Sequence, residues 1–243
     1  MQKKTDRIQI SEIFTSIEGE GILFGTKTMF VRMAGCHLKC LWCDTAYALP
    51  MKSGHGYTLG YVKNLISKHL QPNTYKVNFT GGEPLLQHES IIDLAKFIKE
   101  EKGLKTYIES SCFDSRRFEK VLPHIDICKI EFKMSDSKVV NTKHYANLLC
   151  NEIQCLNLSI ENHKTTYIKI VITGSTDLDE FKNLLKSISI HIKDTNLAGF
   201  IIQPSYGIDE PTVERLFNFY DIVYPIYNDV RIIPQLHKVI GAR

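Results

Sequence analysis

The chain has 243 residues, 43% of them hydrophobic, so it can bury a full core, and we expect one domain spanning residues 1–243 rather than two small ones. Its 30 lysine and arginine residues against 27 aspartate and glutamate residues give a net charge of only +3, which argues against a nucleic-acid or membrane surface and favours a small-molecule substrate. The opening MQKKTDRIQI lacks the apolar core of a signal peptide, and no later stretch approaches the ~20 apolar residues of a membrane span, so we expect a cytoplasmic protein.

Short β-type runs alternate with helical patterns along the chain, and this alternation predicts an α/β fold in which helices cover a parallel sheet. In chain order we expect strands at Ile8 to Thr15 and Thr28 to Met33, followed by a helix that Thr58 caps and that runs to Leu70. Four strands follow, at Lys76 to Phe79, Lys105 to Glu109, Ile125 to Ile130 and Thr166 to Ile172. The last part of the chain predicts a helix from Asp177 to Ile192, a strand at Gly199 to Gln203, a helix from Glu210 to Tyr220 and a strand at Val230 to Ile233.

Two local signals refine these elements. Asp177 with Glu180 three positions later resembles a capping box at the start of a helix. The stretch from Ala48 to Gly60, which is rich in glycine and contains Pro50, predicts an irregular loop. Because functional groups in parallel α/β sheets gather at the carboxyl ends of strands, motifs that directly follow strands are the candidates for a site.

Three cysteines, Cys36, Cys40 and Cys43, stand at CxxxCxxC spacing just after the strand that ends at Met33. A loop of this length can wrap one cuboidal cluster, and three thiolates on a 4Fe-4S cluster leave one iron open to a small chelating molecule. A structural zinc site is the first alternative, but it needs a fourth ligand, and His37 is poorly placed to supply it. Three buried, packed cysteines are the second alternative. The spacing favours the cluster over both.

The other four cysteines are Cys112, Cys128, Cys150 and Cys155. An odd total of seven, with three crowded into one loop, argues against a disulfide framework. A second cluster near Cys150 and Cys155 would need two more thiols close by, so we expect all four to be packed as small hydrophobic side chains.

The cysteine loop resembles that of radical SAM enzymes, which reductively cleave S-adenosylmethionine (SAM) at a 4Fe-4S cluster. Trp42, directly before the last cysteine, matches the aromatic position that is usual in this superfamily, and Thr80-Gly81-Gly82-Glu83-Pro84 resembles its GGEP motif. In the superfamily this motif grips the methionyl amine, since glycines let the backbone approach closely and Glu83 can accept from an ammonium group. Taken alone, the motif could simply be a turn that ends a strand.

Segments outside the cysteine loop narrow the resemblance to the 7-carboxy-7-deazaguanine synthases. They are Phe14 to Gly21, which contains EGEG, Gly25 to Cys36, Trp42 to Thr45, Gln203 to Pro204, and Arg231 to Lys238, which contains PQLHK. The resemblance covers almost the whole chain. It implies a partial TIM-type barrel of about six parallel strands with outer helices, the radical SAM core, and conversion of 6-carboxy-5,6,7,8-tetrahydropterin to 7-carboxy-7-deazaguanine with release of ammonia, on the path to queuosine. It further implies Mg2+, a homodimer, and flavodoxin or ferredoxin as the reductant.

The resemblance also implies a set of site residues, with no catalytic side chain beyond the cluster and SAM. The cluster ligands are Cys36, Cys40 and Cys43, and Thr45 is the ligand of Mg2+. The SAM residues are Trp42, Cys43, Asp44, Gly82, Glu83, Ser111, Lys133, Met134, Ser135, Gln203, Pro204, Ser205 and Tyr206. The substrate residues are Ile17, Glu18, Gly19, Glu20, Arg32, Thr80, Gln235 and His237.

The chemistry of these residue types suits a pterin acid. Glu18 and Glu20 can accept from the N–H donors of a pterin edge, and Arg32 can bind its carboxylate through two parallel hydrogen bonds. Thr45 offers the hard oxygen that Mg2+ prefers. The plainer alternatives are solvated loop carboxylates, an arginine in a salt bridge and a threonine that caps a loop.

Three features depart from the family pattern. Glu18 stands where the family usually has glutamine, which adds a negative charge beside the pterin. The segment Glu131 to Ser135 lacks the proline that is typical there. The chain ends in Ile240-Gly241-Ala242-Arg243, unlike members that use the terminal carboxylate on the substrate.

Two other functions remain open from the residues alone. A glycyl-radical-enzyme activating protein also carries CxxxCxxC in a small barrel, but it needs no pterin pocket with Arg32, Glu20 and a strand bearing His237. A non-catalytic zinc-binding or electron-carrier module would be distinguished by metal content and colour.

Overall fold

The computed structural model describes residues 7–139, 142–193 and 195–242. The strands are β1 (Arg7–Ile17), β2 (Lys27–Met33), β3 (His55–Thr58), β4 (Lys76–Gly81), β5 (Lys105–Ser110), β6 (Ile127–Phe132), β7 (Thr165–Ile172), β8 (Phe200–Pro204) and β9 (Val230–Ile232). The helices are α1 (Leu59–His69), α2 (His88–Lys102), α3 (Ser115–Val121), α4 (Thr142–Glu161), α5 (Leu178–Ile192), α6 (Val213–Val223) and α7 (Leu236–Ile240). In the described part of the chain, no helix has both the length and the apolar character that crossing a membrane requires.

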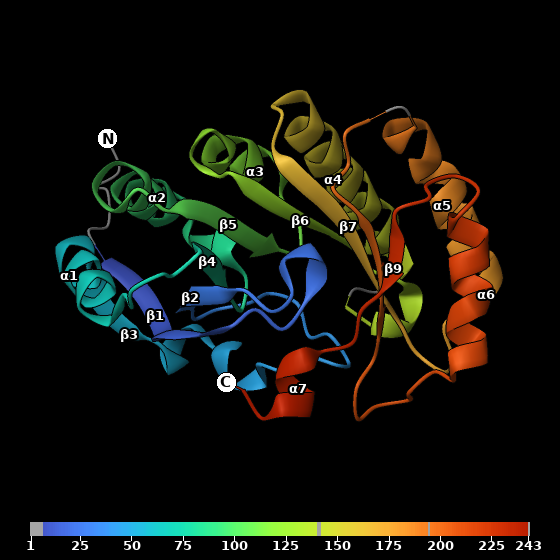
Figure 1. The fold of residues 1–243 in the computed structure, drawn as a ribbon, viewed down its shortest axis with the longest axis horizontal. Coiled ribbons are helices and arrows are strands. Elements are labelled where there is room, and N and C mark those ends of the chain that lie inside the picture. The colour runs from blue at the N-terminus through green and yellow to red at the C-terminus, as the bar shows by residue number, and fades with distance from the viewer. Residues whose placement is uncertain (1–6, 140–141, 194, 243) are drawn as a thin grey trace.

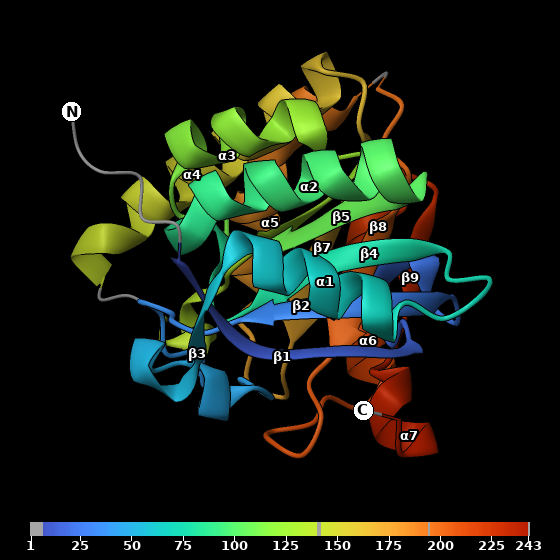
Figure 2. The same ribbon diagram turned by 90° about the vertical axis from the view of Figure 1, so that its left-hand side faces the viewer.

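The strands form one sheet in the order β3-β1-β2-β4-β5-β6-β7-β8-β9. From β2 through β4 to β9, every neighbouring pair is parallel. The sheet curves into an incomplete barrel, with α1 to α6 in an arc around its outside and α7 on the open side (Figure 1). Figure 2 shows α1 and α2 next to one another across the outer surface of the sheet. The predicted partial barrel with outer helices is confirmed, with seven parallel strands in place of about six.

The first and third strands are exceptions to the parallel arrangement. β1 pairs antiparallel with both β2 and β3, because the short segment 18–26 between β1 and β2 cannot hold the crossover that a parallel pair needs. β3 lies inside the stretch from Ala48 to Gly60, so the prediction of an irregular loop was wrong for His55–Thr58. Its side chains are mostly exposed, and backbone pairing with β1 therefore leaves no periodic signal in the sequence.

The two faces of the parallel sheet differ in character. Successive side chains of a strand point to opposite faces, and the outward set packs with the helices in the main core: Val77, Phe79, Ile108, Ile130, Phe132, Ile168 and Ile170. The alternate set is polar: Lys76, Asn78, Thr80, Glu109, Lys129, Glu131 and Lys169. Because parallel strands packed on both faces are apolar throughout, a polar inner face indicates a binding cavity in place of a filled barrel.

A second, smaller core closes the amino end of the barrel. Tyr107, Ile127, Tyr167 and Ile201, all near the starts of their strands, pack against apolar side chains of the turn Gly21–Leu23. Gly21 has φ +66, and a Cβ there would lie 2.1 Å from the Tyr167 hydroxyl oxygen, so only glycine fits. Residues 18–26, which follow β1, thus form the floor of the barrel interior, and we call them the floor segment.

Helix caps follow the predicted residues with one difference. Thr58 caps α1, and Asp177 caps α5 by accepting from the Glu180 N–H at 2.6 Å. The Glu180 side chain does not return to the cap as a capping box requires. It accepts from the N–H and the hydroxyl of Ser135 at 2.8 and 2.5 Å. The second half of the predicted box therefore ties α5 to the loop after β6.

Two predicted boundaries near the carboxyl terminus were wrong. α6 begins at Val213, capped by Thr212, because Pro211 disfavours a helical conformation at Glu210. His237 lies in α7 and not in a strand. β9 ends at Ile232, before Pro234, which cannot donate to a sheet.

Candidate active site

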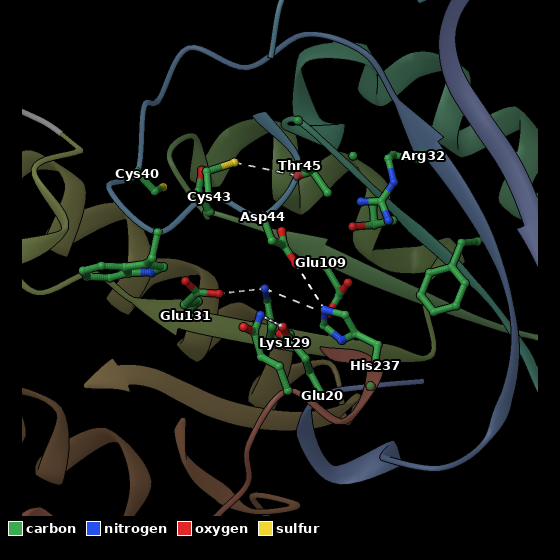
Figure 3. A pocket seen from close by; sticks show the side chains of 18 of the residues that line it. Glu20, Arg32, Cys40, Cys43, Asp44, Thr45, Glu109, Lys129, Glu131 and His237 are labelled. Atoms are coloured by element: carbon green, nitrogen blue, oxygen red, sulfur yellow. Dashed lines mark hydrogen bonds and ion pairs between the residues drawn. The ribbon is translucent and has the colours of Figure 1, made fainter. Parts of the chain in front are cut away.

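A cavity of about 390 Å³ lies inside the barrel. The cysteine loop, the segment after β1, the inner face of the sheet and the region of α7 all line it. Figure 3 shows Cys40, Cys43 and Thr45 on one side of the cavity and Glu20, Lys129, Glu131 and His237 on the other, with Asp44 between the two groups. Segments far apart in the sequence therefore share one chamber.

The three loop cysteines are free, half-buried thiols. The Leu38 N–H donates to the Cys36 sulfur at 3.4 Å, and the Cys43 N–H donates to the Cys40 carbonyl at 3.1 Å. Burial raises the pKa of Cys36 to about 11 and also raises the pKa of Cys40, although nearby Lys133 opposes the second shift. The chain alone thus favours neutral thiols there, and a bound metal centre would supply the positive charge that deprotonates them. Three soft sulfur donors around one space fit an iron–sulfur cluster.

Two glycines, the last residue of β4 and the one after it, allow this strand to pack on the start of the cysteine loop. A Cβ on Gly81 would lie 2.2 Å from the Met33 carbonyl oxygen, and a Cβ on Gly82 would lie 2.3 Å from that of Gly35. Hydrogen bonds of 3.0 Å from Gly82 N to Met33 O and 2.7 Å from Glu83 N to Gly35 O fix this contact. The close approach in this structure is therefore to the backbone that leads into Cys36.

Glu83 is nearly fully buried, and four hydrogen bonds reach its carboxylate. Oε1 accepts from the Leu85 N–H at 2.9 Å and the Ser110 hydroxyl at 2.8 Å. Oε2 accepts from the N–H and the hydroxyl of Ser111 at 2.8 and 2.6 Å. Since a carboxylate has about four acceptor positions, Glu83 as seen here fixes the end of β5, and an ammonium group would have to displace one of these donors.

Arg32 lies on β2 and lines the cavity opposite the floor segment. Its Nε donates to Glu12 Oε1 at 2.8 Å, and the Tyr47 hydroxyl donates to the same oxygen at 2.6 Å. The guanidinium also stacks on the Phe14 ring at 5.7 Å from its centroid. Because Glu12 engages Nε, the two terminal nitrogens remain the groups available to a ligand carboxylate.

Glu18 is buried in the barrel interior beside Lys76. Lys76 Nζ lies 2.5 Å from Glu18 Oε2, and Asn78 donates to the same oxygen at 3.4 Å and to Glu109 at 3.0 Å. Burial raises the pKa of Glu18 to about 7, although the charge of Lys76 opposes this rise and that of Glu109 adds to it. The extra negative charge that distinguishes Glu18 from a glutamine is thus matched by a buried lysine.

Glu20 connects three elements through its two oxygens. Oε1 accepts from the Gln235 amide at 2.6 Å, and Oε2 accepts from Lys169 on β7 at 2.7 Å.

Asp44 pairs with His237 near Glu20. His237 Nε2 lies 3.4 Å from Asp44 Oδ2. Burial would raise the pKa of Asp44, but His237 holds it below its usual value. One ligand atom from each of Glu20, Asp44 and His237 lies within 4.8 Å of the others.

Glu131 stands at the centre of three lysines. Lys129 Nζ is 2.8 Å and Lys169 Nζ is 3.1 Å from its Oε2, and Lys133 bonds its Oε1. Burial would raise the pKa of Glu131, but the three ammonium groups hold it well below its usual value. Lys169 therefore bridges Glu131 on the sheet to Glu20 on the floor segment.

The structure brings most of the predicted site residues to the cavity. All eight substrate residues, the four metal ligands and eight SAM residues line it: Trp42, Cys43, Asp44, Gly82, Glu83, Ser111, Lys133 and Gln203. The Gln203 Oε1 atom is buried and has no partner among the described residues, so it can accept from a ligand.

Five residues predicted for SAM do not line this cavity: Met134, Ser135, Pro204, Ser205 and Tyr206. Met134 is packed in the main core, and Ser135 binds Glu180. The Ser205 hydroxyl donates to a backbone carbonyl at 3.1 Å, and Tyr206 is exposed.

The sequence interpretation missed Glu12, Lys76, Lys129, Glu131 as an ion-pair centre, and Lys169. A signal for β6 was present, because Lys129, Glu131 and Lys133 stand at every second position of an otherwise apolar run and must share one face. Of the other cysteines, Cys112, Cys128 and Cys155 are buried as predicted, whereas Cys150 is exposed, so that prediction was wrong.

Comparison with known proteins places these features in context. Residues 17–153 match the family described as a 4Fe-4S single cluster domain. The chain is similar to the 7-carboxy-7-deazaguanine synthase of Methanocaldococcus jannaschii, with 32% identity over 96% of this chain and 99% of that protein. It is also similar to the 7-carboxy-7-deazaguanine synthase of Methanothermobacter thermautotrophicus, with 28% identity over 98% of both. Among solved structures, the fold is similar to QueE from Escherichia coli, with a TM-score of 0.64, 18% identity and 95% of both chains covered.

Proposed function

This chain belongs to the 7-carboxy-7-deazaguanine synthase family, and we propose that it converts 6-carboxy-5,6,7,8-tetrahydropterin to 7-carboxy-7-deazaguanine with release of ammonia. The observation that carries the proposal is a single cavity with three cluster-type thiols in one wall and Arg32, Glu18 and Glu20 in the others. A thiol-lined wall suits cofactor chemistry, and a guanidinium with carboxylates suits an acid that carries ring N–H donors.

Cys36, Cys40 and Cys43 would hold a 4Fe-4S cluster that supplies an electron for reductive cleavage of SAM, which starts the radical reaction. The rest of the task falls to this chain's own side chains. Lys133 and Gln203 line the cavity and would bind SAM, and the packed floor segment would keep water out at the amino end of the barrel. Holding the two reacting molecules in fixed contact is the main contribution that a protein makes to such chemistry.

Substrate recognition is proposed for residues on three sides of the cavity. The terminal nitrogens of Arg32 would bind the pterin carboxylate, while Glu18 and Glu20 would accept from ring N–H donors. Gln235 and His237 would support this set, since Gln235 orients Glu20 at 2.6 Å.

Thr45 is proposed as a residue that would hold Mg2+, which would in turn bind the substrate carboxylate. The Thr45 hydroxyl lies 3.8 Å from the Cys43 sulfur and lines the same cavity as the Asp44 carboxylate. Hard oxygen donors with room for substrate oxygens suit Mg2+.

Thr45→Ala is expected to raise the Mg2+ concentration for half-maximal activity by roughly tenfold, because one oxygen ligand is lost. Titration of anaerobic turnover with MgCl2 measures this shift. Thr45→Ser keeps the hydroxyl and serves as the control. An unaltered titration curve for the alanine variant would remove Thr45 from the metal site.

The wider setting is proposed from the family. A flavodoxin or ferredoxin would deliver the electron, a homodimer would be the functional form, and the cytoplasm would keep the thiols reduced. Light scattering of the cluster-loaded protein tests the dimer, and comparison of acidic one-electron carrier proteins as reductants tests the donor.

The decisive experiment is anaerobic incubation of the reconstituted protein with SAM, reductant and 6-carboxytetrahydropterin, with products identified by mass. We expect about four irons per chain, 7-carboxy-7-deazaguanine and ammonia from turnover, and methionine with 5'-deoxyadenosine from uncoupled cleavage of SAM. A brown protein that cleaves SAM but leaves the pterin intact would favour a glycyl-radical-enzyme activating protein. A colourless protein with one zinc would indicate a non-catalytic module.

A further inference from the structure

Lys76 is a fully buried ammonium group that lies behind the Glu18 carboxylate, outside the lining of the cavity. Its exposure is 0%, and it stands at the start of β4, directly beside Thr28 of β2 in the sheet register. A buried ammonium is costly unless its charge is balanced and its hydrogen atoms have acceptors.

All three of its N–H groups have a partner. Nζ lies 2.5 Å from Glu18 Oε2, 2.7 Å from the Thr28 hydroxyl and 4.9 Å from the centroid of the Tyr107 ring. Lys76 is therefore fully occupied, and it does not line the cavity itself. It reaches the cavity only through Glu18.

Glu18 has one oxygen turned to Lys76 and one without a partner. Lys76 and Asn78 both donate to Oε2, whereas none of the described residues donates to Oε1. Glu18 lines the cavity. A glutamine at this position would remove the nearest counter-charge of Lys76 and leave the more distant Glu109 as the other carboxylate that acts on it, so the acid at position 18 and the buried lysine are matched.

We propose that Lys76 is a positioning residue for substrate recognition, which balances and orients Glu18 so that Oε1 meets ring N–H donors of the substrate. This rests on the proposed pterin substrate. The pair then acts as one unit: the acid gives a charge-assisted hydrogen bond that an amide could not give, and the lysine makes that acid tolerable inside the barrel.

Removal of the lysine should weaken binding through Glu18. In Lys76→Met, we expect KM for the pterin to rise roughly ten- to hundredfold, with kcat changed far less. The pterin-independent cleavage of SAM should persist. The double variant Glu18→Gln with Lys76→Met should recover thermal stability and part of the affinity, because it removes both charges together.

The pH profile separates positioning from general destabilisation. Carboxylates at Glu109 and Glu20, the phenols of Tyr107 and Tyr167, and the ammonium of Lys76 surround Glu18. Burial raises the pKa of Glu18 to about 7 while Lys76 holds it down. Loss of Lys76 must therefore move the pH at which KM worsens upward, and the double variant, with no acid at position 18, must lose that titration.

The experiment is a comparison of wild type, Lys76→Met, Glu18→Gln and the double variant, each loaded with its cluster, by KM and kcat from pH 6 to 9 and by thermal unfolding. The proposal is supported if the pH below which KM rises is higher in Lys76→Met than in the wild type, and if this pH dependence is lost in the double variant. An unshifted KM profile, or a double variant no better than the worse single one, overturns it. For a variant whose turnover is too poor for a KM, calorimetry measures the affinity for the pterin directly. Absence of pterin turnover by the wild type would refute the proposed function instead.

Discussion

Arg32→Ala is expected to raise KM for 6-carboxytetrahydropterin by about 10²- to 10³-fold while pterin-independent SAM cleavage continues. Two charge-assisted hydrogen bonds to a carboxylate contribute about 3–4 kcal/mol together, after their competition with water. Arg32 is suited to such a clamp because Glu12 already holds its Nε at 2.8 Å and the Phe14 ring supports its plane. Steady-state kinetics with 5'-deoxyadenosine and deazaguanine measured separately tests the prediction.

Two variants serve as controls for Arg32→Ala: one removes an arginine on the surface, and the other changes the carboxylate that holds Arg32. Arg231 makes a bidentate pair with Asp229 at 2.7 and 2.8 Å on the surface, so Arg231→Ala should leave KM unchanged. Glu12→Gln should give a smaller rise than Arg32→Ala, because it loosens the guanidinium without removing it. An Arg32→Ala enzyme with the KM of the wild type would show that the carboxylate is bound elsewhere.

The features that were predictable from sequence are local ones. The cysteine loop could be read from Cys36, Cys40 and Cys43 within one short segment, and the parallel strands from their runs of β-branched residues. The family of the chain was recognisable because its motifs also lie in short segments, and the comparisons with known proteins confirm the family. The prediction failed at β3 because pairing with β1, a partner outside the segment, holds this strand in place.

Apart from the charged residues on β6, the charged interior was not predictable, because its other pairs join residues that are distant in the chain. Glu18 and Lys76 are 58 positions apart, and Glu20 and Lys169 are 149 apart. A lysine within a strand reads equally well as an exposed edge residue until the barrel places it inside. Glu83 is a similar case: its motif predicts contact with an ammonium group, whereas Ser110 and Ser111, 27 and 28 positions away, occupy its oxygens.

Lys169 has the largest predicted effect within this charged network. Its ammonium lies 2.7 Å from Glu20 Oε2 and 3.1 Å from Glu131 Oε2, and its side chain is only 5% exposed. Without it, Glu131 keeps Lys129 and Lys133, whereas Glu20 keeps only the Gln235 amide as a hydrogen-bond donor among the described residues. The damage should therefore fall on the substrate side of the cavity and leave the wall beside SAM largely intact.

Lys169→Met is accordingly expected to lower the free energy of unfolding by about 3–5 kcal/mol, the usual consequence of removing one partner from a buried ion pair. It should also reduce the yield of 7-carboxy-7-deazaguanine per SAM cleaved by roughly tenfold or more, since a displaced Glu20 no longer holds the pterin against the site of radical formation. Denaturant unfolding and the ratio of deazaguanine to 5'-deoxyadenosine measure the two effects. Lys182→Met is the matched control, because Lys182 pairs with Asp179 at 2.9 Å on the exposed surface. Loss of this pair should lower the free energy of unfolding by at most about 1 kcal/mol. If Lys169→Met lost stability but kept the wild-type product ratio, Lys169 would be a structural ion-pair partner only, and Glu20 would hold its place against the pterin without it.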